Sequence, residues 1–267
     1  MIFEKSKILT SPHAFSTRDG GVSYLNHTKS LNLAFERGDD SETVIKNLEI
    51  FASAVGFDSH SVVSLPQIHS TLVHKVDASH MGAGYYKRDF DAMDIREGDG
   101  YITNARGVTL GVKSADCVPI LFEATDGYGE IIGVGAVHAG WRGTVGKIAE
   151  VCVNKLISEY GAKKENIRAC IGPCIHKCCF EVGDDVKEAV FALGKDFEAF
   201  CPESGKGDGK YFCDLVSVNR RILLLSGLLS ENIDTVDECT CCHPEKYYSH
   251  RYSKGHRGTM LSVISMG

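Results

Sequence analysis

The sequence predicts an α/β or mixed α+β protein whose helices and sheets are stacked in layers, and three observations lead to this fold class. Apolar runs typical of β-strands alternate along the chain with segments of helical periodicity, which favours a layered fold over an all-β sandwich. The 267 residues contain no internal repeat, low-complexity tract or proline- or serine-rich linker. Hydrophobic and charged fractions of 43% and 24% are those of an ordinary globular protein. We therefore expect a single domain over residues 1–267.

The expected strands are segments that alternate in polarity or form short apolar runs. Residues 61–70 and 71–76 form two of them, residues 107–124 read as two strands that meet at Ser114–Cys117, and residues 130–139 form another.

The expected helices are three segments with apolar residues at helical spacing, residues 41–56, 143–161 and 217–228. Ser41 is the expected N-cap of the first helix, and Gly56 is its expected stop. Because these helices are interleaved with the strands, neither class of element is confined to one part of the chain.

Charge and hydropathy exclude several classes of function. A formal net charge of −6 argues against a nucleic-acid surface, which usually needs a basic stripe. No run of about 18 apolar residues occurs, so we expect no membrane span. The first residues are too polar and too acidic for a signal peptide, and the cytoplasm is the expected location. Nothing in the sequence specifies an oligomeric state.

The chain has eleven cysteines, an odd number, and without an export signal they are expected to be thiols and not a disulfide framework. Two cysteine-rich segments, residues 174–179 and 239–243, could hold a structural zinc ion. The Cys-x-Cys-Cys-His run of the second segment differs from the Cys-x2-Cys spacing of a zinc ribbon. Buried free thiols are therefore the preferred interpretation of both segments.

Three metal-binding residue types lie at the ends of predicted strands: His69, Cys117 and His138. Two imidazoles and one thiolate can form the first shell of a catalytic zinc ion, with a fourth position for water. The bound metal would lower the pKa of that water and make it a nucleophile. The alternative is that these residues are core histidines and a buried cysteine, and their spacing alone does not decide between the two.

Two arginines and an aspartate near glycine-containing turns are further candidates. Gly140 and Gly143 form a turn into a helix, where backbone N–H groups and Arg142 could bind an anion. Arg18 precedes a Gly-Gly turn and could also contact an anion. Asp99 could act as a general acid or base, or could simply be the turn residue of an Asp-Gly pair.

Taken together, eight stretches of this chain resemble the bacterial YfiH-like proteins, which carry the names laccase domain or polyphenol oxidase and are recognised as purine nucleoside phosphorylases. In chain order these stretches are STRDGGVS, SLNLAFERGDD, LPQIHS, GDGYIT, SADCVPILF, AVHAGWRGT, IGPCIHKCCFEVGDDV and CTCCHPEKYYSHR. The resemblance extends from about residue 10 to the C-terminus, and SADC together with HAGWRGT is its most specific part.

The resemblance implies a layered fold of helices on mixed β-sheets in one domain. It implies zinc held by His69, Cys117 and His138, and small-molecule partners in the form of purine nucleosides and phosphate. The implied activity is phosphorolysis of adenosine, inosine, guanosine and methylthioadenosine to the free base and ribose 1-phosphate, with adenosine deamination beside it. On chemical grounds we expect the phosphate near Arg142 or Arg18.

One cleft with zinc, an arginine and Asp99 could carry out either reaction, with a carboxylate or another group moving the protons. The sequence departs from the usual family pattern at His176–Lys177, and also in SHRYSKGHRGTM near the C-terminus. We therefore expect the C-terminal loop to contact substrate in its own way.

Other functions remain as alternatives. Two histidines and a cysteine also form a blue-copper ligand set, which a copper-dependent polyphenol oxidase would use. However, none of the eleven histidines forms the His-x-His pair of a multicopper cluster. A cysteine hydrolase would use Cys117 as nucleophile and His138 as base. A binding module without catalysis would leave the polar residues at the strand ends unexplained.

Overall fold

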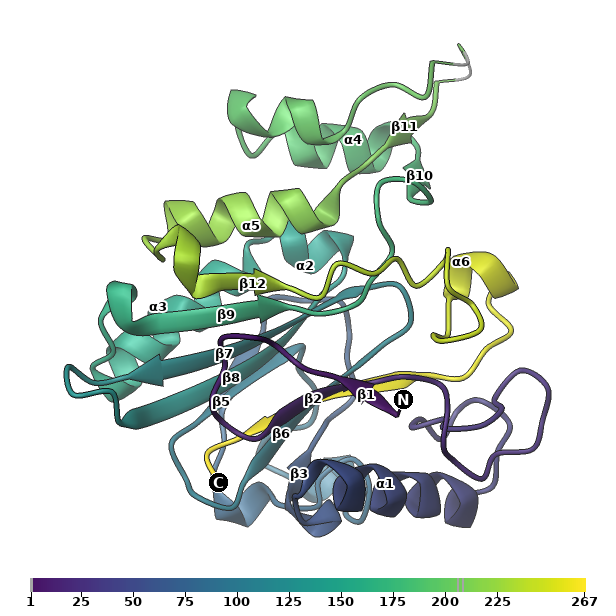
Figure 1. Ribbon diagram of the computed structural model, residues 1–267, viewed down its shortest axis with the longest axis vertical. Helices are drawn as coiled ribbons and strands as arrows, with labels where there is room; N and C mark the ends of the chain where they lie inside the picture. Colours follow the sequence, from purple (N-terminus) through teal and green to yellow (C-terminus); the bar gives the residue numbers. More distant parts are fainter. Residues whose placement is uncertain (1, 206, 208) are drawn as a thin grey trace.

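Two mixed β-sheets form the centre of the fold (Figure 1) in a computed structural model that describes residues 2–205, 207 and 209–267. The first sheet has the order β1-β2-β13-β6-β3, with bounds Phe3–Glu4, His13–Ser16, Met260–Ser265, Thr109–Ser114 and Val62–Val63. The second has the order β12-β9-β7-β8-β5-β4, with bounds Ile233–Thr235, Ile167–Ile171, Val118–Thr125, Ile131–Ala139, Gly100–Thr103 and Val73–Lys75. A separate antiparallel pair consists of β10 (Glu181–Val182) and β11 (Tyr211–Phe212).

Helices cover the outer faces of both sheets, so the fold has a layer of helix on each side of the paired sheets (Figure 1). The α-helices are α1 (Ser41–Val55), α2 (Trp141–Val145), α3 (Ile148–Tyr160), α4 (Asp184–Phe191), α5 (Leu215–Leu225) and α6 (His250–Ser253). Short 3-10 helices occupy Ser59–Ser61, Ala78–His80, Phe90–Ala92, Lys164–Asn166, Lys195–Phe200 and Ser230–Asn232. Helix α1 packs on the first sheet, and α3 and α5 pack on the second. The predicted mixed α+β layered fold is confirmed.

Alternate side chains of the central strands enter different layers of the core, as the period of a β-strand requires. On β7, Ile120 and Phe122 face the helices, whereas Leu121 faces the first sheet. On β8, Val137 faces the helices and Ala136 faces the first sheet. Both strands are buried on two faces, which explains why residues 118–125 and 131–139 appear in the sequence as nearly continuous apolar runs.

Ser41, the expected N-cap, is the first residue of helix α1, and the N-cap is Asp40. The Asp40 carboxylate accepts a hydrogen bond from the backbone N–H of Thr43 at 2.7 Å, so the cap lies one residue earlier than predicted. The predicted stop is confirmed, because Gly56 adopts a left-handed conformation with φ 98°.

The helix expected over residues 143–161 is two helices in the structure. Helix α2 ends at Val145 and α3 begins at Ile148, and between them Lys147 has a left-handed backbone with φ 60°. A residue in the left-handed conformation interrupts the hydrogen bonds of a right-handed helix and changes the direction of its axis. The apolar periodicity of the sequence continues across this break, which is why the sequence predicts one helix.

The strand expected over residues 61–70 is confirmed only at Val62–Val63, which pairs in parallel with β6. Pro66 cannot donate a ladder hydrogen bond, and the backbone N–H groups of residues 68–70 donate to a side chain. His69 therefore lies in a loop and not at a strand end. The expected pair of strands within residues 107–124 and the strand over 130–139 are confirmed.

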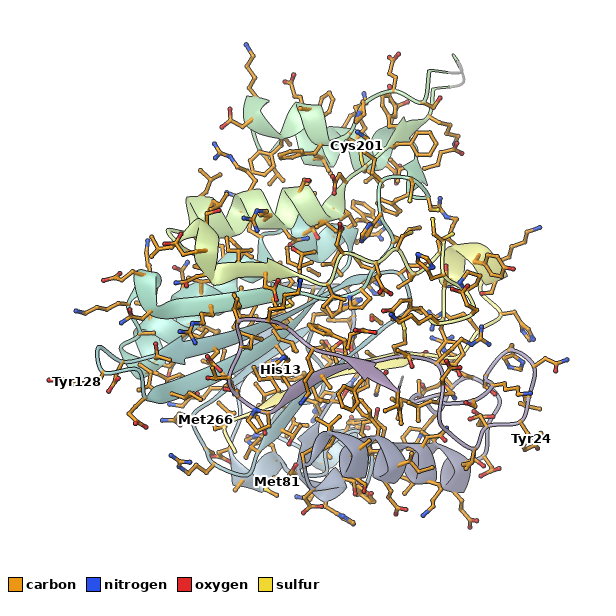
Figure 2. All side chains as sticks on the ribbon, in the orientation of Figure 1. His13, Tyr24, Met81, Tyr128, Cys201 and Met266 are labelled. Carbon is orange, nitrogen blue, oxygen red and sulfur yellow. A yellow bond between two sulfur atoms is a disulfide. The ribbon has the colours of Figure 1, made fainter. Side chains whose placement is uncertain are left out.

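One cysteine pair differs from the expectation that all eleven are thiols, because Cys201 and Cys213 form a disulfide. Cys201 directly follows the 3-10 helix Lys195–Phe200, and Cys213, 12 residues later, directly follows β11. Figure 2 shows Cys201 beside α4, at the end of the molecule opposite α1. Among the described residues, no helix has the length and apolar character needed to cross a membrane.

Candidate active site

His138 lies near the end of β8, opposite Pro119 of β7. Its Nδ1 atom is 2.9 Å from Oδ1 of Asp99, and its backbone N–H donates to the Asp99 carbonyl oxygen at 2.7 Å. Both side chains are buried. Because the carboxylate accepts a hydrogen bond from Nδ1, Nε2 is the ring nitrogen that remains to bind a metal ion or a substrate proton.

The same carboxylate fixes the loop that carries His69. Asp99 accepts hydrogen bonds from the backbone N–H groups of Ile68, His69 and Ser70 at 3.2, 3.0 and 2.6 Å, and from the Ser70 hydroxyl at 2.7 Å. Burial alone would raise the pKa of Asp99, but the hydrogen bonds from His138 and Ser70 lower it to about 2. A carboxylate with these partners orients both histidines.

Cys117 lies in the tight turn between β6 and β7, and Asp116 gives this turn its shape. Asp116 has φ 92°, a conformation that L-residues rarely adopt and that its surroundings must hold in place. Its carboxylate accepts hydrogen bonds from the Thr240 hydroxyl at 2.6 Å and from the backbone N–H of Arg251 at 2.7 Å. Its carbonyl oxygen accepts one from the backbone N–H of Ile175 at 2.9 Å.

The three side chains predicted to bind metal come together. The candidate ligand atoms of His69, Cys117 and His138 all lie within 4.8 Å of one another. The two imidazole rings meet edge to face, with their centroids 5.0 Å apart and an interplanar angle of 81°. Two nitrogen donors and one sulfur donor at this spacing fit a single metal ion that keeps an open coordination position.

Mutual contact shifts the pKa values of the cysteine and the histidine in opposite directions. Burial raises the pKa of the Cys117 thiol, but contacts with His138 and His69 outweigh this effect and lower it to about 6. Burial lowers the pKa of His138, whereas the Cys117 sulfur and the Asp99 carboxylate raise it to about 9. The arrangement thus favours the thiolate, which is the form in which cysteine binds metals.

Because Gly140 has no side chain, it leaves room for the side chains of His69, Cys117 and His138. A Cβ atom at this position would lie 3.1 Å from Cδ2 of His69, 3.3 Å from Sγ of Cys117 and 3.5 Å from Cε1 of His138. The backbone of Gly140 has φ −56°, which other residues adopt freely, so the constraint comes from the neighbouring side chains.

We expect Gly140→Ala to weaken metal binding about 10-fold, the smaller of the losses typical when groups that orient metal ligands are disturbed. The added methyl group presses on His69 and Cys117, and is in ordinary van der Waals contact with His138, without straining the backbone. Competition with a chromophoric chelator measures the affinity. Gly127→Ala is the matched control, because a Cβ atom there meets nothing within 4 Å. Equal affinities of the two variants would show that Gly140 does not shape the site.

A pocket with a volume of about 290 Å³ opens beside the three candidate ligands. Its lining includes the apolar side chains Phe35, Leu65, Pro66 and Phe90 and the basic side chains Arg37, Arg88, Lys113 and Arg257, with Glu36 as the acidic residue. An apolar wall beside a cluster of cations suits a ligand that combines a planar ring with a negative group.

Two of these arginines meet at one hydroxyl group. Nη1 of Arg257 donates to Oγ1 of Thr259 at 2.7 Å, and Nε of Arg37 donates to the same oxygen at 3.3 Å. Nε of Arg257 is buried without a hydrogen-bond partner among the described residues. Burial, together with the nearby charge of Arg37, lowers the pKa of Arg257 to about 10. Two crowded cations with an unused donor form a site that an anion would complete.

The two arginines singled out from the sequence lie elsewhere. Arg142 is exposed on α2, and its guanidinium stacks over the Trp141 ring at 4.2 Å from the ring centroid. Arg18 donates hydrogen bonds to the carbonyl oxygens of Lys29 and Pro244, and it borders a separate pocket of about 160 Å³. Neither side chain lines the pocket next to His138.

The basic residues that line the pocket are not among the site residues predicted from the sequence. Arg257 belongs to the C-terminal segment that departs from the family pattern, which was the one available signal. Lys113 is held beside the His69 loop, because its backbone N–H and C=O groups bond to the Gln67 side chain at 2.6 and 2.8 Å. Arg37 lies in the SLNLAFERGDD stretch that resembles the family, but nothing in that stretch indicates a role for its side chain.

This fold and this set of possible metal ligands define a class of layered α+β proteins with a pocket between strand ends and loops. The chain belongs to the family described as multi-copper polyphenol oxidoreductase laccase, whose model matches residues 12–267. The resemblance noted in the sequence is thus confirmed.

Individual relatives cover nearly the whole chain. It is 36% identical over 252 residues to purine nucleoside phosphorylase YlmD of Bacillus subtilis (strain 168), with 94% of this chain and 87% of the relative covered. It is 34% identical over 257 residues to adenosine deaminase RL5 from an unknown prokaryotic organism, with 92% and 90% covered. The crystal structure of YlmD from Geobacillus stearothermophilus aligns with a TM-score of 0.87 at 32% identity, with 99% of this chain and 98% of that chain covered.

Proposed function

We propose that this protein is an enzyme that cleaves purine nucleosides with phosphate, releasing the free base and ribose 1-phosphate, and that it also deaminates adenosine. Adenosine, inosine, guanosine and methylthioadenosine are the proposed substrates, and the cytoplasm is the proposed location. The observation that carries the proposal is the pocket, which joins a metal-ligand set, an apolar wall and a cationic cluster in one volume. The names of the relatives YlmD and RL5 support both reactions.

The donor atoms support zinc as the metal held by His69, Cys117 and His138. Within the described part of the chain, the groups able to hold a metal are this set and an all-cysteine set, and neither is the multi-histidine cluster of a multicopper oxidase. When bound there, zinc supplies a Lewis acid that activates water for attack on the purine.

The residues of the pocket match the two halves of the phosphorolysis reaction. Arg257 and Arg37 present cationic donors to a phosphate, and Phe35 and Phe90 offer apolar surface to the purine. A phosphate oxygen bonds to C1′ of the ribose while the glycosidic bond breaks. The electron pair of the glycosidic bond passes to the purine nitrogen, and the purine takes up a proton. Cations close to the phosphate hold it against the positive charge that develops on the ribose.

The test is a product analysis of the metal-analysed protein incubated with adenosine, with and without phosphate. Adenine and ribose 1-phosphate that appear only with phosphate establish phosphorolysis, and inosine formed regardless of phosphate establishes deamination. Both products should be absent from Cys117→Ala and His138→Ala. Activity that survives chelation but not thiol alkylation would instead support the cysteine hydrolase. A zinc-loaded protein that forms neither product would overturn the nucleoside proposal.

Phosphate use should also depend on the protonation of Lys113. Burial lowers its pKa to about 8, with Glu36 raising it and Arg88 lowering it further. Its Nζ lies 5.0 Å from the centroid of the Tyr85 ring, and Arg37 and Arg257 line the same pocket. The ammonium group is therefore present below about pH 8 and is lost as the pH rises above it.

We expect the KM for phosphate to increase as the pH is raised through about 8 in the natural protein. In Lys113→Arg the arginine side chain stays charged over this pH range. The KM of this variant for phosphate should therefore change with pH only because phosphate itself ionises. Initial rates over a phosphate series at each pH give both profiles. Parallel profiles for the two proteins would show that Lys113 does not contact the anion.

A further inference from the structure

The two cysteine-rich segments lie side by side because the strands before them are neighbours. Strands β9 and β12 pair in parallel, so the segments that leave their carboxyl ends emerge at the same edge of the second sheet. Beyond the strands, the backbones of Cys174 and Cys239 form an isolated parallel β-bridge. The backbone N–H of Thr240 donates to the carbonyl oxygen of Cys174 at 2.9 Å. Segments far apart in sequence are thus held in register up to the cysteines.

Four sulfur atoms converge where the segments meet. The Sγ atoms of Cys178, Cys179, Cys239 and Cys242 all lie within 4.8 Å of one another. Sγ of Cys242 is 3.5 Å from that of Cys178 and 3.4 Å from that of Cys179. With zinc–sulfur bonds of about 2.3 Å, the sulfurs of a tetrahedral site lie about 3.8 Å apart, which agrees with this spacing.

The exposure of these thiols differs from that expected of core cysteines. Cys178 and Cys242 are exposed, Cys179 is half-buried and Cys239 is buried. The four are free thiols as predicted, but the predicted burial is wrong for Cys178, Cys179 and Cys242. Cys239 and Cys242 have two residues between them, so the Cys-x2-Cys spacing is present within the CTCC run.

We propose that Cys178, Cys179, Cys239 and Cys242 bind one zinc ion as a closed tetrathiolate site, separate from the His69, Cys117 and His138 set. Four thiolates fill the coordination shell and leave no position for water or substrate, so the role of this ion is structural. The backbone N–H of His176 lies 3.4 Å from Sγ of Cys239 and donates to it, as groups around zinc thiolates commonly do. The two exposed sulfurs give the ion a route of entry from solvent.

This ion would also support the turn that carries Cys117. Thr240 lies between two of the four cysteines, and its hydroxyl holds the left-handed Asp116 next to Cys117. Ile175, in the other segment, donates its backbone N–H to the Asp116 carbonyl. A metal that joins the two segments would therefore fix two of the three partners of Asp116, Thr240 and Ile175.

Metal analysis of full-length variants tests the proposal, with apo-protein reconstituted with zinc under reducing conditions. Cys117→Ala removes the other site, so it should retain one zinc ion per chain. Cys117→Ala combined with Cys242→Ser should lose that ion and melt at a lower temperature. The matched control is Cys117→Ala combined with Cys241→Ser, which should keep the ion because the Cys241 sulfur is outside the group.

Cobalt substitution in Cys117→Ala gives an independent readout that does not depend on whether the double variant folds. A tetrathiolate site gives intense thiolate-to-cobalt charge-transfer bands and the ligand-field bands of a tetrahedral ion. Their appearance would support the proposal. A Cys117→Ala protein that binds neither zinc nor cobalt, or peptide mapping that finds Cys242 in a disulfide with Cys178 or Cys179 under the same conditions, would overturn it. Because both measurements use Cys117→Ala, neither outcome depends on the nucleoside reaction.

Discussion

Asp99→Asn is expected to lower metal affinity at the His69, Cys117 and His138 set, and with it kcat/KM, by about 100-fold. Changes to the partners of metal-binding histidines typically cost 10- to 100-fold, and Asp99 serves two ligands at once. Its Oδ1 atom accepts hydrogen bonds from His138 and from the backbone N–H of His69. Its Oδ2 atom accepts from Ser70 through both the backbone and the hydroxyl. Asparagine has one acceptor oxygen, so one of these groups of donors would face an NH2 group.

Chelator competition and steady-state kinetics of Asp99→Asn measure the two losses. Asp126→Asn is a matched control, because Asp126 also accepts hydrogen bonds from backbone N–H groups, those of Tyr128 and Glu130, but in the exposed turn between β7 and β8. It should retain normal metal affinity and kcat/KM. If Asp99→Asn kept the natural metal affinity and lost only kcat, Asp99 would have a direct part in proton transfer, as the sequence first indicated, and would not be a positioning residue.

The positions of the candidate ligands Cys117 and His138 could be predicted because local patterns determine them. Cys117 directly precedes β7 and His138 is the second-last residue of β8, and the apolar runs of both strands are legible in the sequence. The pairing of Val118 with Ala139 then brings the two side chains together. His69 had no such strand, and only the hydrogen bonds of its loop to Asp99 place it in the site.

The basic pocket could not be predicted, because it depends on contacts between the ends of the chain. Arg37 and Arg257 are 220 residues apart and meet at Thr259 only because β13 joins the first sheet next to β2. The backbone N–H of Leu33 donates to the Thr259 carbonyl at 3.0 Å and fixes this meeting point. Local sequence instead drew attention to arginines beside glycine turns, which bind carbonyl oxygens or stack on rings.

Arg257→Met is expected to reduce kcat/KM for phosphorolysis about 100-fold, mostly through a higher KM for phosphate. Hydrogen bonds to charged groups contribute about 1.5–3 kcal/mol each, and about 1.4 kcal/mol corresponds to tenfold. Nε of Arg257, which has no hydrogen-bond partner in the described part of the chain, would supply such a bond to an anion in the pocket. Methionine retains much of the length of the side chain, so the loss reports the charge and the donors more than the packing.

Deamination uses no phosphate, so the inosine formed from adenosine should fall far less than the adenine in the same Arg257→Met samples. This split separates loss of the anion site from damage to the metal site, which would lower both products together. Arg142→Met is the competing variant: the pocket geometry predicts a near-normal KM for phosphate, whereas the assignment based on the glycine turn predicts the larger loss there. If Arg142→Met raised the KM for phosphate and Arg257→Met did not, the phosphate would bind at the start of α2, and the cluster around Thr259 would have to serve another part of the substrate.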